Sequence, residues 1–419
     1  MSAAISVLGW VFTAIASLGV IYTILAALAV KWFFIRPVSQ PTACLPVTIL
    51  KPLHGDEFGL AVRLEGFCTQ DYPAPVQIIF GVRDGSDPAA GIVKQLIGTY
   101  PELDIHLVVS NRTFGANRKI SNLINMERLV RHPIIVIADS DITVDPDYLR
   151  VLVAALAPPD IGFVTCAYVG VPTRSTWSRL SAMAMNYHFL PSVAFGLRIG
   201  LAKPCFGPTI ALRKTVFDEI GGLARFADHL ADDFEIGRAI RDLGYSFAVP
   251  PMTVGHACPE RNGLHVGSHE LRWARTLRLI DPVSYAGSAI MHPLPFALVA
   301  IVLLQGSMTS LMVLAVVCGA RMFVMERVER FASCSRGIWW LWPARDLLSA
   351  LIYAWAFLGK TVTWRGRTFR IGREGQLIPH PPGADESTGK ESGPVTGLAS
   401  IPTGRPSEDL APVVLSAMR

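Results

Sequence analysis

Residues 1–30 contain no charged side chain, and this stretch constrains the fold more than any other part of the sequence. It is longer than the roughly 20 apolar residues that a membrane-spanning helix needs. No basic stretch precedes it, and Lys31 and Arg36 follow it directly, which is not the arrangement of a cleavable signal. Basic residues after a span indicate the cytoplasmic side. The sequence therefore predicts an N-terminal transmembrane helix within residues 1–36, followed by a cytoplasmic domain.

A second apolar region covers residues 286–360. With the first, it explains why 51% of the 419 residues are hydrophobic and only 17% are charged, a composition too apolar for an ordinary soluble enzyme. It contains two apolar blocks, 286–324 and 337–358, so we expect about two spans or hairpins. Two full spans would break the positive-inside rule by placing four arginines outside, namely Arg321, Arg327, Arg330 and Arg336. Either that loop overrides the rule, or one block is a re-entrant or interfacial hairpin.

Cysteine usage and charge narrow the possible functions. The seven cysteines form no Cys-x-x-Cys pair, so neither a disulfide framework nor a zinc ribbon is indicated. His256, Cys258, His265 and His269 are close in sequence, but their spacing matches no standard zinc pattern. The formal charge of +5, with basic residues near the apolar regions, suggests an anionic membrane surface rather than nucleic acid. Gly, Pro, Ser, Thr and acidic residues dominate 374–419, which we expect to be disordered.

Between the apolar regions, short β-rich runs alternate with segments of helical length. This alternation predicts an α/β domain with a mainly parallel sheet and right-handed crossovers. In such a sheet, ligands bind beyond the carboxyl ends of the strands. The predicted strands are Val47–Leu50, Gln77–Val82, His106–Val109, Ile134–Ala138 and Gly162–Tyr168.

Acidic residues follow two of these runs. Asp139 and Asp141 come directly after the run that ends at Ala138, and Asp84 follows the run that ends at Val82. Alternate residues of an extended segment point the same way, so Asp139 and Asp141 could bind one hard cation whose partner is a diphosphate. An Asp-rich turn is the plain alternative, because Asp is a common turn former. Two acidic loops at one edge of the sheet favour a binding site.

Two predicted helices begin with charged residues. Lys119 lies in the first turn of one, where acids are normally preferred, so a base there favours a bound anion such as a diphosphate, although a plain surface lysine is the alternative. Asp232 and Asp233 open the other. Such a pair often caps a helix, but two adjacent carboxylates also perturb each other's ionisation, as a general base often requires.

Two more motifs lie farther along the domain. Residues 203–209 form a predicted rigid turn whose glycine lets a ligand approach the backbone. His269, Arg272 and Trp273 come just before the second apolar region. An arginine and an indole at that position could belong to a site or simply anchor the chain at the membrane interface.

The order of these features resembles the membrane-bound glycosyltransferases of families 2 and 21, and most closely the ceramide glucosyltransferase group. The resemblance includes the motifs at 51–55 and 117–122 and covers roughly residues 1–373. The runs at 186–191 and 269–275 are similar to the bacterial hopanoid-associated branch, which resembles enzymes that attach N-acetylglucosamine to bacteriohopanetetrol. The resemblance implies a GT-A fold, Rossmann-like with a mainly parallel sheet, over residues 44–285.

The resemblance also implies roles for individual residues. Asp84 is expected to contact the uracil and Lys119 to help bind the nucleotide, while Arg272 and Trp273 close the donor site. A divalent cation, Mg²⁺ or Mn²⁺, is expected to join the diphosphate to Asp139 and Asp141, and Asp233 is expected to be the base. His269 stands where the family has Gln or Arg, and its imidazole could still hydrogen-bond to a phosphate. The eight residues named in this paragraph form the predicted site.

We therefore expect an inverting glycosyltransferase that uses a UDP-sugar and a lipid alcohol at the cytoplasmic face of a bacterial inner membrane. N-acetylglucosamine and a hopanoid polyol are the first substrate pair, and glucose and ceramide are the second. Such a reaction needs cations for the leaving diphosphate and a base for the attacking hydroxyl. A processive polysaccharide synthase is disfavoured, because so few spans could hardly form an export channel. An inactive scaffold of a lipid pathway is disfavoured, because all the acids are present.

Overall fold

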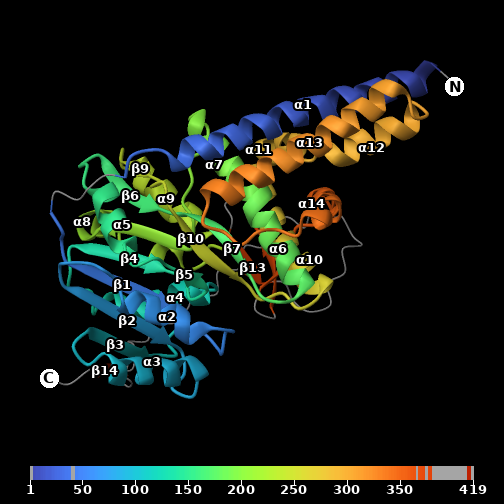
Figure 1. Cartoon of the computed structure of the whole chain (residues 1–419). Helices are drawn as coiled ribbons and strands as arrows, with labels where there is room; N and C mark the ends of the chain where they lie inside the picture. The colour runs from blue at the N-terminus through green and yellow to red at the C-terminus, as the bar shows by residue number, and fades with distance from the viewer. Residues whose placement is uncertain (1–2, 39–42, 365–366, 373–375, 380–412, 417–419) are drawn as a thin grey trace.

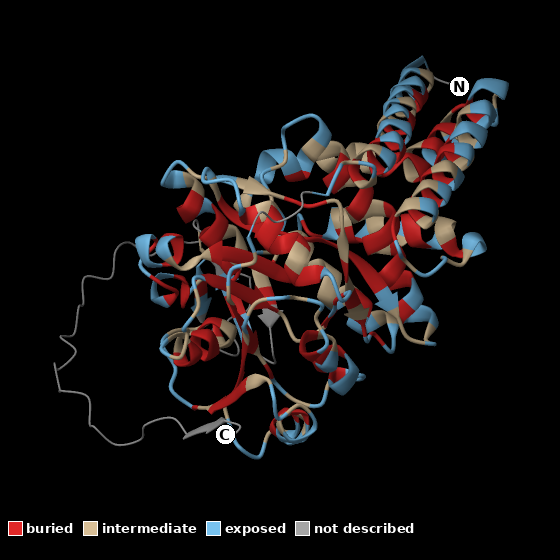
Figure 2. Cartoon of the chain, turned by 60° about the vertical axis from the view of Figure 1, so that its left-hand side comes forward, coloured by how far each residue is buried: buried red, intermediate tan, exposed pale blue. Residues whose placement is uncertain are grey.

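The computed structural model describes residues 3–38, 43–364, 367–372, 376–379 and 413–416. It has two parts, a layered α/β domain and a bundle of apolar helices that extends away from it (Figure 1). Figure 2 shows that the strands of the domain are largely buried, whereas the helix that starts at the N-terminus exposes residues along its whole length.

The main sheet has eight strands in the order β14-β3-β2-β1-β4-β8-β6-β9. Strands β3, β2, β1 and β4 pair in parallel, β8 runs antiparallel between β4 and β6, and β9 is parallel to β6. This arrangement confirms the predicted α/β fold. The strands are β1 (Val47–Pro52), β2 (Val76–Val82), β3 (Asp104–Val109), β4 (Ile134–Ala138), β6 (Ile161–Thr165), β8 (Thr209–Arg213), β9 (Ser246–Ala248) and β14 (Val413–Ser416).

Helices cover both faces of this sheet, which explains why its strands are apolar without alternation. Neighbouring residues of one strand serve opposite faces, so Ile49 belongs to one hydrophobic core and Leu50 to the other. One core contains α2 (Leu60–Cys68), α3 (Pro88–Thr99) and α5 (Tyr148–Leu156). The other contains α4 (Arg118–Glu127), α8 (Lys214–Glu219) and α9 (Asp232–Asp242).

The fifth predicted strand, Gly162–Tyr168, is two strands in the structure. The chain leaves the main sheet after β6, and β7 (Ala167–Pro172) joins a second sheet of order β5-β10-β7. In that sheet, β10 (Thr253–Cys258) pairs with both β5 (Ile142–Thr143) and β7. Both halves of the run are buried, so the apolar pattern alone could not reveal the change of sheet.

Three helices form what we call the apolar bundle: α1 (Ala3–Phe34), α12 (Pro293–Leu303) and α13 (Met308–Phe331). By length and composition, α1 and α13 could each cross a membrane. A third candidate is the pair 282–291 and 293–303, which is bent by 62°. Helix α1 lies along α12 and α13 (Figure 1), and at Gly19 a Cβ would lie 2.7 Å from the carbonyl oxygen of Ile290. Glycine there permits this close approach, as in helix pairs within membranes.

The apolar bundle removes the conflict with the positive-inside rule. The first apolar block is a hairpin of α12 and α13, and the end of α13 returns to the domain, where Val328 shares a hydrophobic core with Phe33 of α1. Arg327 and Arg330 therefore lie at the same end of the bundle as Lys31. The second block forms α14 (Trp342–Trp355), which is not among the candidate spans of the described residues. The expectation that one block is a re-entrant or interfacial hairpin stays a prediction.

The end of the described chain returns to the domain. Strands β11 (Thr361–Trp364), β12 (Arg367–Ile371) and β13 (Leu377–Pro379) form a small sheet, and Val362, Phe369 and Leu377 pack against Leu230. Residues 374–419, predicted to be disordered, lie mostly outside the described residues, so that expectation stays a prediction. Within that range the structure has two short strands, β13 and β14, and β14 pairs with β3.

Candidate active site

The carboxyl ends of β2 and β4 lie at the same edge of the sheet, because both strands are parallel to β1, which lies between them. Asp139 follows β4 directly. Its Oδ1 lies 2.7 Å from Nζ of Lys119, and its amide donates a hydrogen bond to the carbonyl oxygen of Pro208 at 3.3 Å. Burial raises the pKa of the Asp139 carboxyl, although Lys119 acts in the opposite direction. Asp139, at the end of β4, is therefore paired with Lys119, the residue predicted to help bind the nucleotide.

Asn117 places Lys119 in this site. Its side chain caps α4 by accepting hydrogen bonds from the amides of Lys119 at 2.9 Å and Ile120 at 3.1 Å. Its Nδ2 donates to Asp232 Oδ1 at 3.1 Å, so one side chain joins the first turns of α4 and α9. Nζ of Lys119 also lies 3.4 Å from Asp232 Oδ2. Burial alone would lower the pKa of Lys119, but Asp139, Asp232 and Asp233 together raise it, so this amine stays charged.

Asp233 faces the same region. Its Oδ2 accepts a hydrogen bond from the amide of Gly207 at 2.8 Å, and its Oδ1 accepts one from the amide of Phe234 at 2.8 Å. Burial and the neighbouring Asp232 raise the pKa of Asp233 to about 6. A carboxyl with that pKa is ionised at neutral pH and can still accept a proton, which is what a general base requires.

Gly207 marks the point on which these groups converge. A Cβ at this residue would lie 3.2 Å from Asp233 Oδ2 and 3.6 Å from both Asp139 Oδ2 and Lys119 Nζ. The turn at 203–209 therefore brings bare backbone to within reach of three charged side chains, as expected from its glycine. A larger residue would occupy the space between them.

A second lysine, Lys51, contacts the backbone of Asp139. Lys51, at the end of β1, is fully buried, and its Nζ donates a hydrogen bond to the carbonyl oxygen of Asp139 at 2.7 Å. The same Nζ lies 3.6 Å from the ring centroid of Phe67. Burial lowers the pKa of Lys51 to about 7, even though Asp139 and Asp141 act in the opposite direction.

Asp141 lies at the junction of the two sheets, directly before β5. Its Oδ2 is 3.3 Å from Nε2 of His256 on β10. Nδ1 of His256 lies 3.0 Å from the carbonyl oxygen of Ala257, to which a proton on Nδ1 can be donated, and Nε2 can donate to Asp141 when it also carries a proton. Oδ1 of Asp141 is buried and has no hydrogen-bond partner among the described residues. A cation, or a hydrogen-bond donor outside the described residues, could satisfy this oxygen.

Helix α10 (Gly263–Ile280) carries the remaining predicted residues. Nδ1 of His269 lies 2.8 Å from Oε1 of Glu260, which is buried. The ring of Trp273 packs edge-on against His269, with 4.5 Å between centroids, and lies 6.0 Å from the ring of His256. Trp273 thus connects α10 to the residue that faces Asp141. Arg272 lies half-buried on the same helix.

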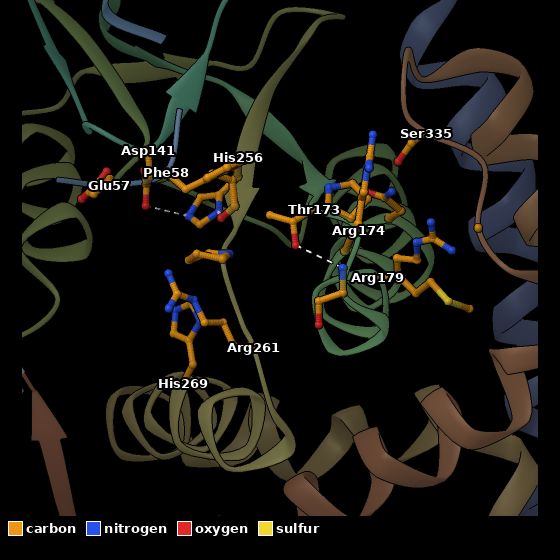
Figure 3. Close-up of a pocket in the computed structure, with 18 of the residues that line it drawn as sticks. Glu57, Phe58, Asp141, Thr173, Arg174, Arg179, His256, Arg261, His269 and Ser335 are labelled. Atoms are coloured by element: carbon orange, nitrogen blue, oxygen red, sulfur yellow. Dashed lines mark hydrogen bonds and ion pairs between the residues drawn. The ribbon is translucent and has the colours of Figure 1, made fainter. Parts of the chain in front are cut away.

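A cavity of about 1200 Å³ begins at this group and extends toward the apolar bundle. Figure 3 shows Asp141 and His256 at one end of it, Arg261 and His269 close together, and Arg174, Arg179 and Ser335 on the other side. Ser335 belongs to the segment that follows α13. The cavity therefore joins the acidic site to the end of the apolar bundle.

A search of known families supports the resemblance. The model of glycosyl transferase family 21 matches residues 11–377. The chain belongs to this family. It is 24% identical to ceramide glucosyltransferase 3 of Caenorhabditis elegans in an alignment of 361 positions that covers 82% of this chain and 76% of that protein. It is 22% identical to ceramide glucosyltransferase 1 of the same organism in an alignment of 355 positions that covers 81% of this chain and 74% of that protein.

The fold of this family 21 glycosyltransferase is similar to that of a solved mannosyltransferase from Pyrobaculum calidifontis. The TM-score is 0.51 at 21% identity, and the match covers 84% of this chain and 99% of the other. The similarity agrees with the GT-A fold expected from the sequence. It concerns the fold alone, so the roles of individual residues depend on the geometry of this chain.

In this family 21 chain, most residues of the predicted site lie close together, but Asp84 lies apart from them. Lys119, Asp139 and Asp233 surround Gly207, and Trp273 reaches Asp141 through His256. Asp84 is exposed, and its Oδ1 accepts hydrogen bonds from the amide and hydroxyl of Ser86, both at 2.9 Å, which lower its pKa. This loop is held through Asp87, whose Oδ1 accepts from the amide of Gly55 at 2.9 Å.

Sequence reasoning missed several residues of the site. Lys51 and Gly55 belong to a motif that was quoted for the resemblance but given no role. Asn117 begins another such motif, and no pattern indicated that its amide joins two helices. His256 was considered only for a zinc cluster with Cys258, His265 and His269. The described residues contain no group of three or more His, Cys, Asp or Glu that could hold a metal, and Cys258 is buried beside Met185.

Proposed function

We propose that this protein transfers a sugar from a UDP-sugar to a hydroxyl group of a membrane lipid, with inversion at the anomeric carbon. The observation that supports this most directly is the convergence of Lys119, Asp139 and Asp233 on Gly207. It combines a permanent cation for a diphosphate with a carboxyl whose pKa suits proton transfer. A cavity lined by Asp141, two residues after Asp139, leads toward the apolar bundle, which is where a lipid hydroxyl would come from.

In this mechanism Lys119 binds the diphosphate and stays protonated while negative charge develops on the leaving group. Asp233 accepts the proton of the attacking hydroxyl, held in place by the amides of Gly207 and Phe234. Arg272, Trp273 and His269 close the donor site from α10, and Asp84 contacts the uracil. One-step attack from the face opposite the leaving group inverts the anomeric centre.

The residues fit a divalent cation. Asp141 has a buried oxygen without a hydrogen-bond partner among the described residues, and Asp139 lies two residues before it. Mg²⁺ and Mn²⁺ favour carboxylate oxygens, and Mg²⁺ is usually held by one or two carboxylates together with substrate phosphates. Asp139 and Asp141 would hold the ion. When bound, it would neutralise charge on the diphosphate.

Two substrate pairs remain in the proposal. The sequence resemblance at 186–191 and 269–275 supports N-acetylglucosamine from UDP-N-acetylglucosamine and a hopanoid polyol, bacteriohopanetetrol. The similarity to two proteins named ceramide glucosyltransferase supports glucose from UDP-glucose and ceramide. The apolar bundle, with basic residues at the domain end, supports a multi-pass membrane protein whose catalytic domain is cytoplasmic. The resemblance to the bacterial hopanoid-associated branch is the reason to propose a bacterial inner membrane.

The test is a side-by-side assay of the purified full chain in nanodiscs with both donors and both acceptors, with lipid products identified by mass spectrometry. We expect one glycolipid whose anomeric configuration is opposite to that of the donor. The Asp233→Asn variant is the negative control. Retention of configuration would contradict the one-step mechanism. Neither transfer nor donor hydrolysis with any pair would favour the inactive scaffold instead.

A further inference from the structure

Three arginines line the side of the cavity that lies away from Asp141. Arg174 lies in the loop after β7, Arg179 lies on α6 (Thr176–Ala184), and Arg336 lies in the segment between α13 and α14. Figure 3 shows Arg174 and Arg179 beside Ser335, the neighbour of Arg336 in sequence. All three side chains are exposed. Three segments that are far apart in the chain therefore form one basic cluster on one wall of the cavity.

These guanidinium groups have no acidic partner in the part of the chain that the structure describes. Among the described residues, none of the three makes a side-chain hydrogen bond or ion pair, whereas Arg63 at the other end of the cavity is paired with Glu57 at 3.4 Å. The acidic residues that line the cavity are Asp56, Glu57 and Asp141. The two ends of the cavity thus carry opposite charge, and the basic end can accept an anion without breaking an existing pair.

Exposed tryptophans lie in the same segments as the arginines of this basic end. Trp339 and Trp340 follow the cavity residue Ile338 and are 65% and 62% exposed, and Trp177, between Arg174 and Arg179, is 39% exposed. Exposed tryptophans beside arginines are typical of the membrane–water interface. Helix α14 continues from there with exposed apolar residues, among them Leu351 and Trp355. An exposed apolar surface therefore follows the basic end of the cavity along the chain.

We propose that Arg174, Arg179 and Arg336 bind the anionic head group of a membrane lipid at the bilayer end of the cavity. Guanidinium groups bind phosphate by paired N–H···O hydrogen bonds, and near a membrane each basic residue contributes to binding anionic lipid. The shared chemistry is a lipid phosphate or carboxylate. It is carried either by a bilayer lipid beside the acceptor or by the acceptor lipid itself. This proposal does not depend on which sugar is transferred.

The first experiment measures binding alone, so a failure of glycosyl transfer cannot be mistaken for a failure of this site. Fluorescent short-chain phosphatidylglycerol and phosphatidylcholine are titrated onto the detergent-purified full chain. The wild type should prefer phosphatidylglycerol. In the triple variant Arg174→Gln, Arg179→Gln, Arg336→Gln the preference should fall by roughly fivefold for each arginine removed. The control is Arg128→Gln with Arg131→Gln, two exposed arginines of the segment that leads into the amino end of β4.

Several results would overturn the proposal. Equal binding of the two probes by the wild type, or an unchanged preference in the triple variant, would show that the arginines do not select an anionic lipid. Inorganic phosphate that displaces the probe as effectively as phosphatidylglycerol would assign them to a free anion. A fall in UDP-sugar affinity equal to the fall in lipid binding would assign them to the donor site.

The second experiment distinguishes the two sources of the anionic group. The wild type in phosphatidylcholine nanodiscs is assayed with a neutral acceptor, with and without phosphatidylglycerol. If the site binds bilayer lipid, phosphatidylglycerol should stimulate transfer, and the triple variant should lose that stimulation. If the acceptor carries the anion, a phosphorylated acceptor should show a lower KM than the neutral one, and only in the wild type. Absence of both effects would contradict the proposal.

Discussion

The chain contains two groups of largely buried charged residues, and they differ in their balance of charge. The site at the carboxyl edge of the sheet has four carboxyl groups, Asp139, Asp141, Asp232 and Asp233, beside Lys51 and Lys119. The group between the domain and the apolar bundle has two arginines and two acids, which pair as Arg345 with Glu270 and Arg321 with Asp346. The first group has an excess of negative charge and the second is balanced.

This difference suggests that the balanced group stabilises the structure, whereas the acidic group binds a ligand. Arg345 is 1% exposed, and its Nη1 and Nη2 donate to the two carboxylate oxygens of Glu270, both at 2.7 Å. Such a bidentate pair needs nothing from outside, and it ties α14 to α10, which carries Trp273. The acidic site needs a cation or a proton to become balanced. An excess of carboxyl groups in a cleft is therefore the feature that we associate with chemistry here, whereas burial of paired charges is not.

Removal of divalent cations should have the largest effect, because the excess of acid at the first group is what a cation would balance. Exhaustive chelation should abolish transfer, and added Mg²⁺ or Mn²⁺ should restore it. In Asp141→Asn the metal concentration needed for half-maximal rate should rise by at least about 10-fold, the loss typical of disturbing a metal site. Asp346→Asn, in the balanced group, should leave the metal requirement unchanged. Full activity after chelation would remove the metal from the proposal.

Replacement of the proposed base should have the next largest effect. Asp233→Asn keeps the shape of the side chain but cannot take a proton, so transfer should fall by about 10²- to 10⁴-fold. UDP-sugar affinity, measured by calorimetry on the same preparation, should stay close to that of the wild type. Asp242→Asn, an exposed acid at the other end of α9, is the matched control. A loss of donor affinity equal to the loss of rate would make Asp233 a binding residue instead.

Substitutions in the balanced group should lower the stability of the protein. Arg345→Met leaves Glu270, whose side chain is only 14% exposed, without its partner, which should lower the free energy of unfolding by about 3–5 kcal/mol. The double variant Arg345→Met, Glu270→Leu should recover most of this loss, because both charges are then gone. The measurement is thermal unfolding in detergent. Arg150→Met, which breaks an exposed pair with Asp71, should cost about 1 kcal/mol or less. Equal losses from both arginines would contradict the comparison.

The dependence of the transfer rate on pH should be the smallest effect near neutral pH. It tests how Asp232 and Asp233 influence each other. A base must be deprotonated to act, and the pKa of Asp233 is raised to about 6 by burial and Asp232. Transfer should therefore be constant above that pH and fall by roughly tenfold for each unit below it. Asp232→Asn removes a neighbouring negative charge, so the break should move to lower pH. A break that does not move would contradict the coupling of the two acids.

Much of the site could be predicted because strand ends are local features. Asp139 and Asp141 directly follow a short apolar run, and strand direction then places them at the same edge as Asp84. The long-range contacts could not be predicted. Asn117 meets Asp232 across 115 positions of sequence, and Lys51 meets the carbonyl of Asp139 across 88. Neither contact leaves a periodic signal, because each depends on how helices and strands pack.

The sequence by itself determined the α/β domain, the first apolar helix, the acidic strand ends and the family, because these depend on local hydrophobic pattern and short motifs. Only the tertiary structure decided that the run after Gly162 divides between two sheets and that the second apolar block lies at the domain. It also decided that Arg321 is buried against Asp346, whereas Arg336 faces the cavity. The physical reason is that a charged side chain is paired or solvated according to what packs beside it, and packing partners come from distant parts of the chain.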